Sequence, residues 1–595
     1  LSRYPIDAPI ENVFVEYNKG KKEDEKMSLA KYKELVSDYT NTSNHQTKEL
    51  FRKTIENIKC AFKTELSKQF KERLAKLRGK VIMLEAPTLF GERTKAEKAE
   101  LKKLKEKLNI LEKEQEDIQT NKLYVDAFEW RFEFPQLLDE NGKFTGFDII
   151  IGNPPYNELR DLDLGMQTAL KSSRYYDYAK GGRLNMFQFF YPLAINVAMD
   201  NGIVSLITQN SILAEDSALG NRKLFFAQTD ILSIDSFPER DNKNLRVFES
   251  AKMSVCICTL RRNNHPDICN IIPINVWHSR YMQDKHELNI TVEEIMEMYP
   301  EDIIIPISSN EKFSILKEIK KKSQYHINAS AGEIDMTKYK SIFNTIGLGT
   351  RVITGAQIQR YYITNTPSQG DVIYIDDSSK PQLSSKRKAE ISQPRIVLQR
   401  ITGVDSKVRI IATLINGSMY CANSTNYIAD DKILSIKYLL GVLNSSLVNF
   451  FIKQTSTNTN ITAKVLSSIP IAVPPNDVQG LIATIVDYII LINSAQNNLS
   501  ELVSNDTIAS YFEKIIDGCV YELYFDGHMK EQEINIIDSA LELIKPITHL
   551  SLDKEKADMI LDVFMNIKKT DNSIRNRLDL FTLRSPEILK LIIEG

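Results

Sequence analysis

The sequence has few of the residues that mark a metal-binding or secreted protein. Its six cysteines are scattered, and Cys256 and Cys258 lie two apart in an apolar run, so we expect them on one face of a strand rather than in a Cys-x-x-Cys site. His265, His278 and His286 lack the i, i+4 spacing of a helical metal pair. We therefore expect no bound metal, a reduced protein and a cytoplasmic location.

Long apolar runs and an excess of positive charge are also missing. We find no signal peptide and no apolar run of about eighteen residues, which argues against secretion and membrane insertion. The formal net charge is -2 over 595 residues, so any nucleic-acid surface has to be local. Residues 331–480 hold such an excess, with 16 Lys+Arg against 10 Asp+Glu. This length predicts roughly two to four globular domains.

The most informative stretch is Phe-Asp-Ile-Ile-Ile-Gly-Asn-Pro-Pro-Tyr, residues 147–156. Its apolar run up to Gly152 predicts a buried strand of a parallel sheet, with helices on both faces. Ligands bind beyond the carboxyl ends of such strands, where Asn153, Pro154, Pro155 and Tyr156 fall. The Asn153 amide oxygen and the Pro154 carbonyl can accept hydrogen bonds from one amino group, and the Tyr156 ring can stack on a planar base.

This motif resembles the catalytic motif of adenine-specific, amino-group DNA methyltransferases. The resemblance implies that Asn153 to Tyr156 form the catalytic loop, that the target adenine is flipped out of the duplex, and that S-adenosyl-L-methionine is the cofactor. It also implies that Asp148 and Asn185 bind the cofactor and that Phe248 lies in the base pocket. The structural alternatives are a helix cap for Asn185 and a core position for Phe248.

The segments around the motif resemble type IIG restriction-modification enzymes. We expect an α/β protein with a partial Rossmann-like methyltransferase sheet, a helical-hairpin insertion, a mixed α/β target recognition domain and a helical C-terminal region. The expected bounds are 1–125 for the helical insertion, 126–325 for the catalytic half, 326–482 for the recognition domain and 483–595 for the C-terminal helices.

Helical periodicity and turn residues predict several elements within these domains. Apolar residues at helical spacing over residues 46–79 and 95–122 predict a hairpin joined near Leu84 to Gly91. Its interspersed charges are typical of a solvated face, the alternative being an arm that grips DNA. Residues 160–183 are expected to form a mobile loop over the base pocket, and residues 437–451 a helix.

The glycines before Asn153 do not form a Gly-x-Gly turn after an apolar strand. Gly347-Leu348-Gly349 is the nearest substitute, but no βα pattern surrounds it. The chain opens at Leu1 and has the sequence of the middle of a longer protein. We therefore expect the S-adenosylmethionine-binding half, and any nuclease, in an upstream chain or domain.

Residues 326–482 contain the side chains that could contact double-stranded DNA, the expected partner. Basic groups can contact phosphates, and arginine can also read guanine edges. Arginines near strand ends are also commonly just solvated. The candidates are Arg351, Arg360, Arg395, Arg400, Arg409 and Lys464.

Three functions are consistent with the sequence. The first is a site-specific DNA adenine methyltransferase of a restriction-modification system, inactive alone if the cofactor motif lies elsewhere. The second is a non-catalytic DNA-binding specificity subunit or fragment that needs a separate cofactor-binding chain. The third is a bifunctional restriction enzyme, but we find no convincing Pro-Asp and Glu-x-Lys nuclease centre in this chain.

Overall fold

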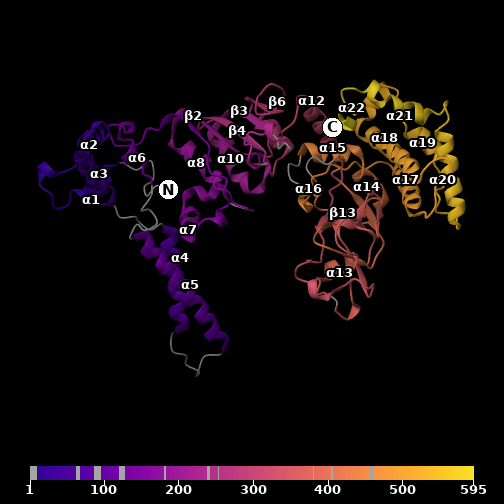
Figure 1. The fold of residues 1–595 in the computed structure, drawn as a ribbon, viewed down its shortest axis with the longest axis horizontal. Coiled ribbons are helices and arrows are strands. Elements are labelled where there is room, and N and C mark those ends of the chain that lie inside the picture. The colour runs from indigo at the N-terminus through magenta and orange to yellow at the C-terminus, as the bar shows by residue number, and fades with distance from the viewer. Residues whose placement is uncertain are drawn as a thin grey trace. The chain divides into compact units, whose positions relative to one another are not determined.

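A computed structural model describes residues 10–61, 68–85, 95–119, 128–179, 183–237, 242–251, 253–379, 381–403, 407–455 and 460–594. The chain forms two compact units (Figure 1). The first comprises Leu1–Lys285 with Ile290–Ile304, and the second His286–Asn289 with Ile305–Gly595. The four-part division expected from the sequence stays a prediction.

A six-stranded sheet carries the Asn153 loop. Its strands are β1 (Phe147–Gly152), β2 (Ala198–Gln209), β3 (Thr229–Phe237), β4 (Val255–Arg262), β5 (Ile271–Trp277) and β6 (Lys285–Thr291), in the order β1-β2-β4-β3-β5-β6. β1 runs parallel to β2, β4 is antiparallel to both β2 and β3, and β5 is parallel to β3. The sheet is therefore mixed, and β1 forms one of its edges.

Helices pack on one face of this sheet. α8 (Phe187–Val197) packs against β2, and α10 (Leu219–Gln228) packs against β3. On the opposite face, Ile149 and Ile151 of β1 are 63% and 80% exposed. The prediction of a strand buried on both faces is therefore wrong. The apolar run favours a strand, but burial depends on neighbours, and among the described residues this edge strand has none on its Ile149 and Ile151 face.

Three N-terminal helices cover the Ile150 face of β1, the face on which α8 residues also pack. α1 (Glu11–Tyr17), α2 (Leu29–Asn41) and α3 (His45–Cys60) share a core with α6 (Trp130–Glu133), and Ile150 of β1 packs against this core. Entry into β1 requires a glycine, because a Cβ on Gly146, which has a φ of +99°, would lie 2.4 Å from the Met199 amide nitrogen.

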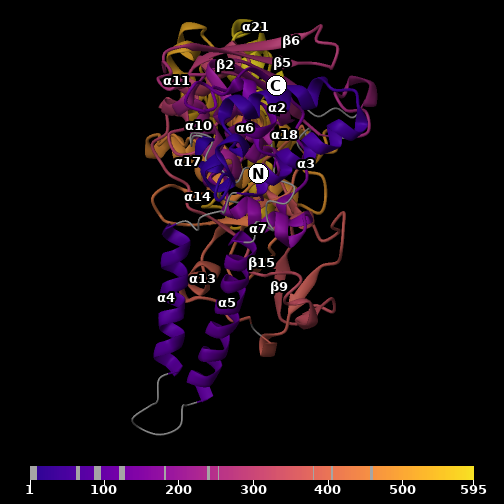
Figure 2. The same cartoon turned by 90° about the vertical axis from the view of Figure 1, so that its left-hand side faces the viewer.

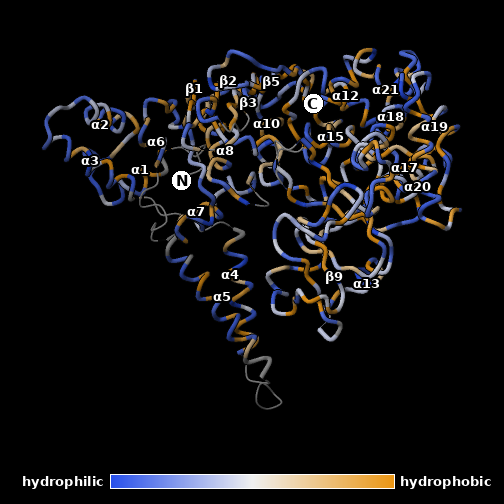
Figure 3. The backbone as a smooth tube through the Cα atoms, turned by 45° about the vertical axis from the view of Figure 1, so that its right-hand side comes forward, coloured by the Kyte–Doolittle hydropathy of each residue, from blue (hydrophilic) through white to orange (hydrophobic). Residues whose placement is uncertain are grey.

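The predicted hairpin is present as α4 (Lys68–Glu85) and α5 (Lys95–Gln119), which lie side by side (Figure 2). Leu74, Val81 and Leu111 are buried between the two helices, and hydrophilic residues alternate with hydrophobic ones along both (Figure 3). The single helical run expected over residues 46–79 is wrong, because α3 ends at Cys60 and α4 begins at Lys68. Most of the expected connection, from residue 86 onward, lies outside the described residues.

The second unit contains two four-stranded sheets. One has the order β14-β13-β16-β7 and the other β15-β9-β12-β8. The strands of the first are β7 (Ala329–Ala331), β13 (Arg395–Gln399), β14 (Ala412–Ile415) and β16 (Thr425–Ala429). Those of the second are β8 (Phe343–Asn344), β9 (Thr350–Ile353), β12 (Ile373–Ile375) and β15 (Tyr420–Cys421). A short β10 (Ile358–Gln359) pairs with β11 (Tyr362–Ile363).

The helix expected over residues 437–451 is two helices, α14 (Ile436–Leu443) and α15 (Ser446–Thr455). Asn444 lies at the break, where its side chain accepts a hydrogen bond from the Ala412 amide and donates one to the Ala412 carbonyl, both at 3.0 Å. This contact with the neighbouring strand explains why the helix ends there, and local sequence periodicity does not reveal it.

The remaining helices are α7 (Leu164–Ser172), α9 (Ser211–Ala214), α11 (Val292–Met298), α12 (Asn310–Lys321), α13 (Ser385–Ile391), α16 (Ala463–Ser467), α17 (Asn476–Ser494), α18 (Asn505–Glu531), α19 (Ile537–Leu543), α20 (Asp553–Ile567), α21 (Ser573–Arg584) and α22 (Leu589–Glu594). α17 is long and apolar enough to cross a membrane by composition, contrary to the expectation of no such run. It packs against α14 and α18 and is 56% buried, as a core helix is.

Candidate functional site

The Asn153 loop lies where two parallel strands end together. Gly152 of β1 pairs with Leu206 of β2, so the residues after β1 lie beside the end of β2. The Tyr156 hydroxyl donates a 3.0 Å hydrogen bond to the Ile207 carbonyl and fixes the loop to this edge. This confirms the predicted position of the loop at the carboxyl end of a parallel strand pair.

The loop presents Asn153 to solvent and anchors itself through its next residue. Pro154 is buried, whereas Asn153 and Pro155 are exposed. The Asn153 side chain makes no hydrogen bond with any residue that the structure describes, so its amide oxygen can accept one from a ligand.

Two aromatic rings pack against the Tyr156 ring of the Asn153 loop. The Tyr156 ring lies 6.1 Å from Phe187 at an interplanar angle of 85°, and 6.1 Å from Phe248 at 68°. Phe187 is fully buried and Phe248 is half-buried. Burial, followed by the neighbouring Cys256 thiol, raises the pKa of Tyr156 to about 12, so its hydroxyl stays a neutral donor near pH 7. The structure thus brings Phe248 next to Tyr156, and its place in a base pocket stays a prediction.

The segment before α8 is bonded to the same loop. The Met186 amide donates to the Asn157 carbonyl at 3.0 Å, which brings Asn185 beside the loop. The Asn185 backbone amide donates to the Gln188 side-chain oxygen at 3.1 Å, and the Gln188 side-chain amide donates to the Ser217 hydroxyl at 2.9 Å. The helix-cap alternative for Asn185 is wrong, since Met186 precedes α8 and no side chain caps it.

The mobile loop expected over residues 160–183 contains regular structure. α7 is capped by Asp163, whose side chain accepts from the Met166 amide, and a 3-10 helix spans Arg174–Ala179. A small apolar core with Leu159, Leu170 and Phe189 holds the segment in place. The loop prediction is therefore wrong for the residues described.

Asp148 does not share this site. It is exposed near the start of β1, five residues before Asn153. At about 3.3 Å per residue the two lie about 16 Å apart along the strand. The structure therefore does not bring the two expected cofactor residues, Asp148 and Asn185, to one place.

Two of the six expected DNA contacts are inaccessible. Arg395 and Arg409 are both 0% exposed. Arg395 forms an ion pair with the equally buried Glu333 at 3.3 Å, and its guanidinium lies 4.8 Å from the Tyr427 ring centroid. The Arg409 guanidinium donates to the Thr402 hydroxyl at 3.2 Å. The DNA-binding expectation for these two arginines is corrected to a role in the interior of the fold, because a buried guanidinium cannot reach a phosphate.

The other candidates are closer to solvent, and the three arginines are bonded to the protein. Arg351 donates to the Thr364 carbonyl at 3.3 Å, Arg360 to Glu513 at 2.7 Å, and Arg400 to Asn460 at 3.1 Å. All three are half-buried, whereas Lys464 of α16 is exposed.

Sequence reasoning missed the roles of two α8 residues. Phe187 packs against Tyr156 of the Asn153 loop, and the Gln188 side chain bonds Asn185 and Ser217. Gln188 is fully buried, which is unusual for its type. The only signal in the sequence was an apolar helix after a polar segment. Within the described ranges, no group of three or more His, Cys, Asp or Glu side chains could hold a metal ion.

Comparison with family models gives two matches. Residues 19–243 match the Eco57I restriction-modification methylase, and this range includes β1, the Asn153 loop and α8. Residues 350–471 match the TaqI-like C-terminal specificity domain, which includes β9 to β16.

Individual proteins give more distant similarities. A Methanocaldococcus jannaschii protein, named as a type II restriction enzyme and methyltransferase, is 22% identical over 475 residues, which are 76% of this chain and 37% of that protein. The chain thus spans little more than a third of the length of this curated relative. The DNA complex of the type IIL restriction-modification enzyme MmeI has a TM-score of 0.39 at 13% identity, covering 74% of this chain and 57% of MmeI. The DNA-bound type ISP enzyme LlaBIII has a TM-score of 0.38 at 10% identity, covering 65% and 34%.

Proposed function

We propose that this chain, which carries an Eco57I restriction-modification methylase domain and a TaqI-like C-terminal specificity domain, belongs to a site-specific DNA adenine methyltransferase. The two matches support a DNA methyltransferase of a restriction-modification system. The finer proposal is that a methyl group passes from S-adenosyl-L-methionine to the exocyclic amino group of a flipped adenine in double-stranded DNA. We place this activity in the cytoplasm.

The observation that carries this proposal is the unbonded amide of Asn153 at the loop that Tyr156 fixes in place. The Asn153 amide oxygen and the Pro154 carbonyl would accept the two hydrogens of the adenine amino group. Two such bonds localise the lone pair of the adenine amino nitrogen on the side away from its hydrogens. From that side the nitrogen attacks the methyl carbon of the donor. The Tyr156 ring would stack on the base once it has left the duplex.

The described residues do not build a site for the methyl donor. Asp148 lies at the far end of β1 from Asn153, and the sequence before β1 contains no Gly-x-Gly turn after a strand. We therefore derive only how this chain holds the target base. S-adenosylmethionine supplies a methyl group on a positively charged sulfur, and we assign its pocket to another domain or chain.

The open edge of β1 supports that assignment. Parallel sheets are normally covered on both faces, and exposed strand edges are normally protected. β1 instead exposes Ile149 and Ile151, and its only strand neighbour is β2 within the part of the chain described. We propose that an α/β body adds a strand parallel to β1 and covers the two isoleucines. The carboxyl end of that added strand would then place the cofactor beside Asn153.

The same open edge favours the alternative of a DNA-binding specificity subunit that needs a separate cofactor-binding chain. The two functions differ in what Asn153 does. In the methyltransferase it contacts the target base, whereas in a non-catalytic specificity subunit its side chain can be removed without loss of methylation by the assembled enzyme.

Equilibrium binding of labelled S-adenosyl-L-methionine to the purified 595-residue chain, with and without duplex DNA, tests the assignment of the cofactor site. We expect no saturable cofactor binding and a DNA affinity that falls steeply with salt. Saturable binding by this chain alone would overturn the assignment to another body. Absence of any DNA binding would contradict the proposed function as a whole.

A further inference from the structure

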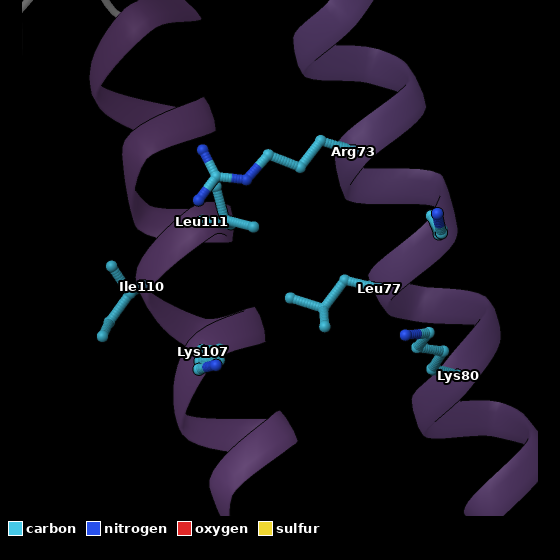
Figure 4. A pocket seen from close by; sticks show the side chains of 7 residues that line it. Arg73, Leu77, Lys80, Lys107, Ile110 and Leu111 are labelled. Atoms are coloured by element: carbon cyan, nitrogen blue, oxygen red, sulfur yellow. The ribbon is translucent and has the colours of Figure 1, made fainter. Parts of the chain in front are cut away.

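The helical hairpin carries a groove lined by positive charge. Arg73, Lys76 and Lys80 of α4 and Lys107 of α5 surround a cavity of about 370 Å³ whose apolar side is formed by Leu77, Ile110 and Leu111. Figure 4 shows Arg73 and Leu77 extending from α4 toward α5. The four cationic side chains are exposed, and Leu111 is buried between the helices.

The spacing of these residues makes the groove a continuous stripe. Positions 73, 76, 77 and 80 follow the i, i+3, i+4, i+7 pattern that places side chains on one face of a helix. At 1.5 Å per residue, the three α4 cations span about 10 Å along the helix. Like charges at such spacing destabilise an isolated helix, so the stripe has a cost that a bound anion would remove.

The opposite flank of the hairpin shows the usual pattern for charged helices. There Arg78 pairs with Glu112 at 2.9 Å, and Lys105 pairs with Glu85. In contrast, none of the four groove cations has a carboxylate within 4.0 Å among the described residues. α4 as a whole has six basic and two acidic side chains, in a chain whose net charge is -2. The basic excess is therefore local to α4, and three of its six cations line the groove.

We propose that this groove binds the phosphate backbone of double-stranded DNA without reading its sequence. The proposal rests on the proposed function, in which the chain acts on duplex DNA. One DNA strand rises about 3.4 Å per phosphate, so a stripe of about 10 Å faces about three phosphates. The lysine stems can lie on the apolar side of the groove while their ammonium groups reach the phosphates. This role differs from base recognition by the specificity domain.

The test compares two variants of the full chain with equal loss of charge. The groove variant is R73Q/K76Q/K80Q, and the control is K71Q/K102Q/K113Q, whose lysines are exposed and lie off the groove on the same helices. Fluorescence anisotropy with a labelled duplex, from about 50 to 200 mM salt, gives the slope of log affinity against log salt. The magnitude of that slope falls by about 0.9 for each phosphate that the protein no longer neutralises. We expect a reduction of about 2 to 3 for the groove variant and less than about 1 for the control.

A charge-preserving variant, R73K/K76R/K80R, keeps the result interpretable. It should retain the parental slope, and helix content measured by circular dichroism should be the same in all variants. Equal slopes for the groove variant and the control would overturn the proposal while leaving the proposed function intact. Loss of binding to single-stranded RNA but not to duplex DNA would overturn the duplex assignment. A parent chain that binds no duplex DNA would contradict the proposed function itself.

Discussion

Replacement of Arg395 should destabilise the second compact unit rather than weaken a DNA contact. Arg395 and Glu333 are both 0% exposed, and the guanidinium also donates to the Met419 carbonyl. Arg395→Met leaves the Glu333 carboxylate buried without its cation, and breaking one partner of such a pair costs about 3–5 kcal/mol. A typical domain has about 5–15 kcal/mol of unfolding free energy, so this loss is a large fraction of it.

R395M leaves one buried charge without a partner, whereas the double variant R395M/E333Q removes both charges. Comparing the two separates the cost of an unpaired buried charge from the loss of the ion pair. The introduced glutamine would keep an oxygen for the Cys421 amide, which donates to Glu333 at 3.0 Å in the parent. Removing both charges should therefore recover most of the lost stability. Urea unfolding followed by far-ultraviolet circular dichroism measures the change. Trp130 and Trp277 both lie in the first unit, so the tryptophan fluorescence transition serves as an internal control.

A structural role for Arg395 would be contradicted if R395M kept the parental unfolding free energy and had a lower affinity for duplex DNA. That result would show that Arg395 reaches the nucleic acid. Arg400→Met is the matched comparison, because this arginine is half-buried and bonded to Asn460 and the Asn423 carbonyl. We expect it to cost about 1 kcal/mol, the usual contribution of such hydrogen bonds.

Three other changes have distinct expected outcomes. Tyr156→Phe removes only the hydrogen bond to Ile207 and should cost about 1 kcal/mol in stability. Methylation assays on the full-length protein should show near-parental activity for Y156F and a loss of about 10- to 100-fold for Tyr156→Ala, which would remove the proposed stacking on the base. Burial raises the pKa of Asp517 to about 6, so its protonated form stabilises the fold at low pH and this stabilisation is lost as pH rises from about 4 through 6. Asp517→Asn should therefore raise the unfolding free energy at about pH 8 by up to about 3 kcal/mol and leave it unchanged below about pH 4, and a pH-independent effect in urea titrations would contradict this. Ile149→Lys with Ile151→Lys should weaken copurification of the chain with the proposed cofactor-binding body, because these side chains are 63% and 80% exposed on the open edge strand; copurification equal to that of the parent would argue against an interface there.

The position of the Asn153 loop was predictable because its signals are local. A β-branched run, a glycine and two prolines mark where a strand ends, and those residues need no distant partner to be recognised. The hairpin was predictable for the same reason, since apolar spacing within each helix is enough to show which face is buried.

The environment of β1 and of Arg395 was not predictable, because distant parts of the chain decide it. Whether Ile151 is buried depends on which strand or helix covers it. The local apolar sequence is the same whether the strand is covered or open. Arg395 looks like a basic strand end until Glu333, far away in the sequence, is seen to face it. The contact between Tyr156 and Phe248 was suggested only by the family resemblance, because no local pattern brings the two rings together.

DNA methylation by the full-length protein carrying Asn153→Ala shows whether Asn153 takes part in methyl transfer. The protein, with any subunits that copurify, is incubated with S-adenosyl-L-methionine and unmethylated plasmid DNA in EDTA, which withholds divalent metal from any nuclease. Single-molecule sequencing then maps N6-methyladenine. Asn157→Ala is the matched control, because Asn157 is an exposed asparagine of the same loop. We expect the parent and N157A to methylate adenine within one sequence motif, and we expect N153A to lose this methylation. Undiminished adenine methylation by N153A, or methylation of cytosine instead, would contradict it.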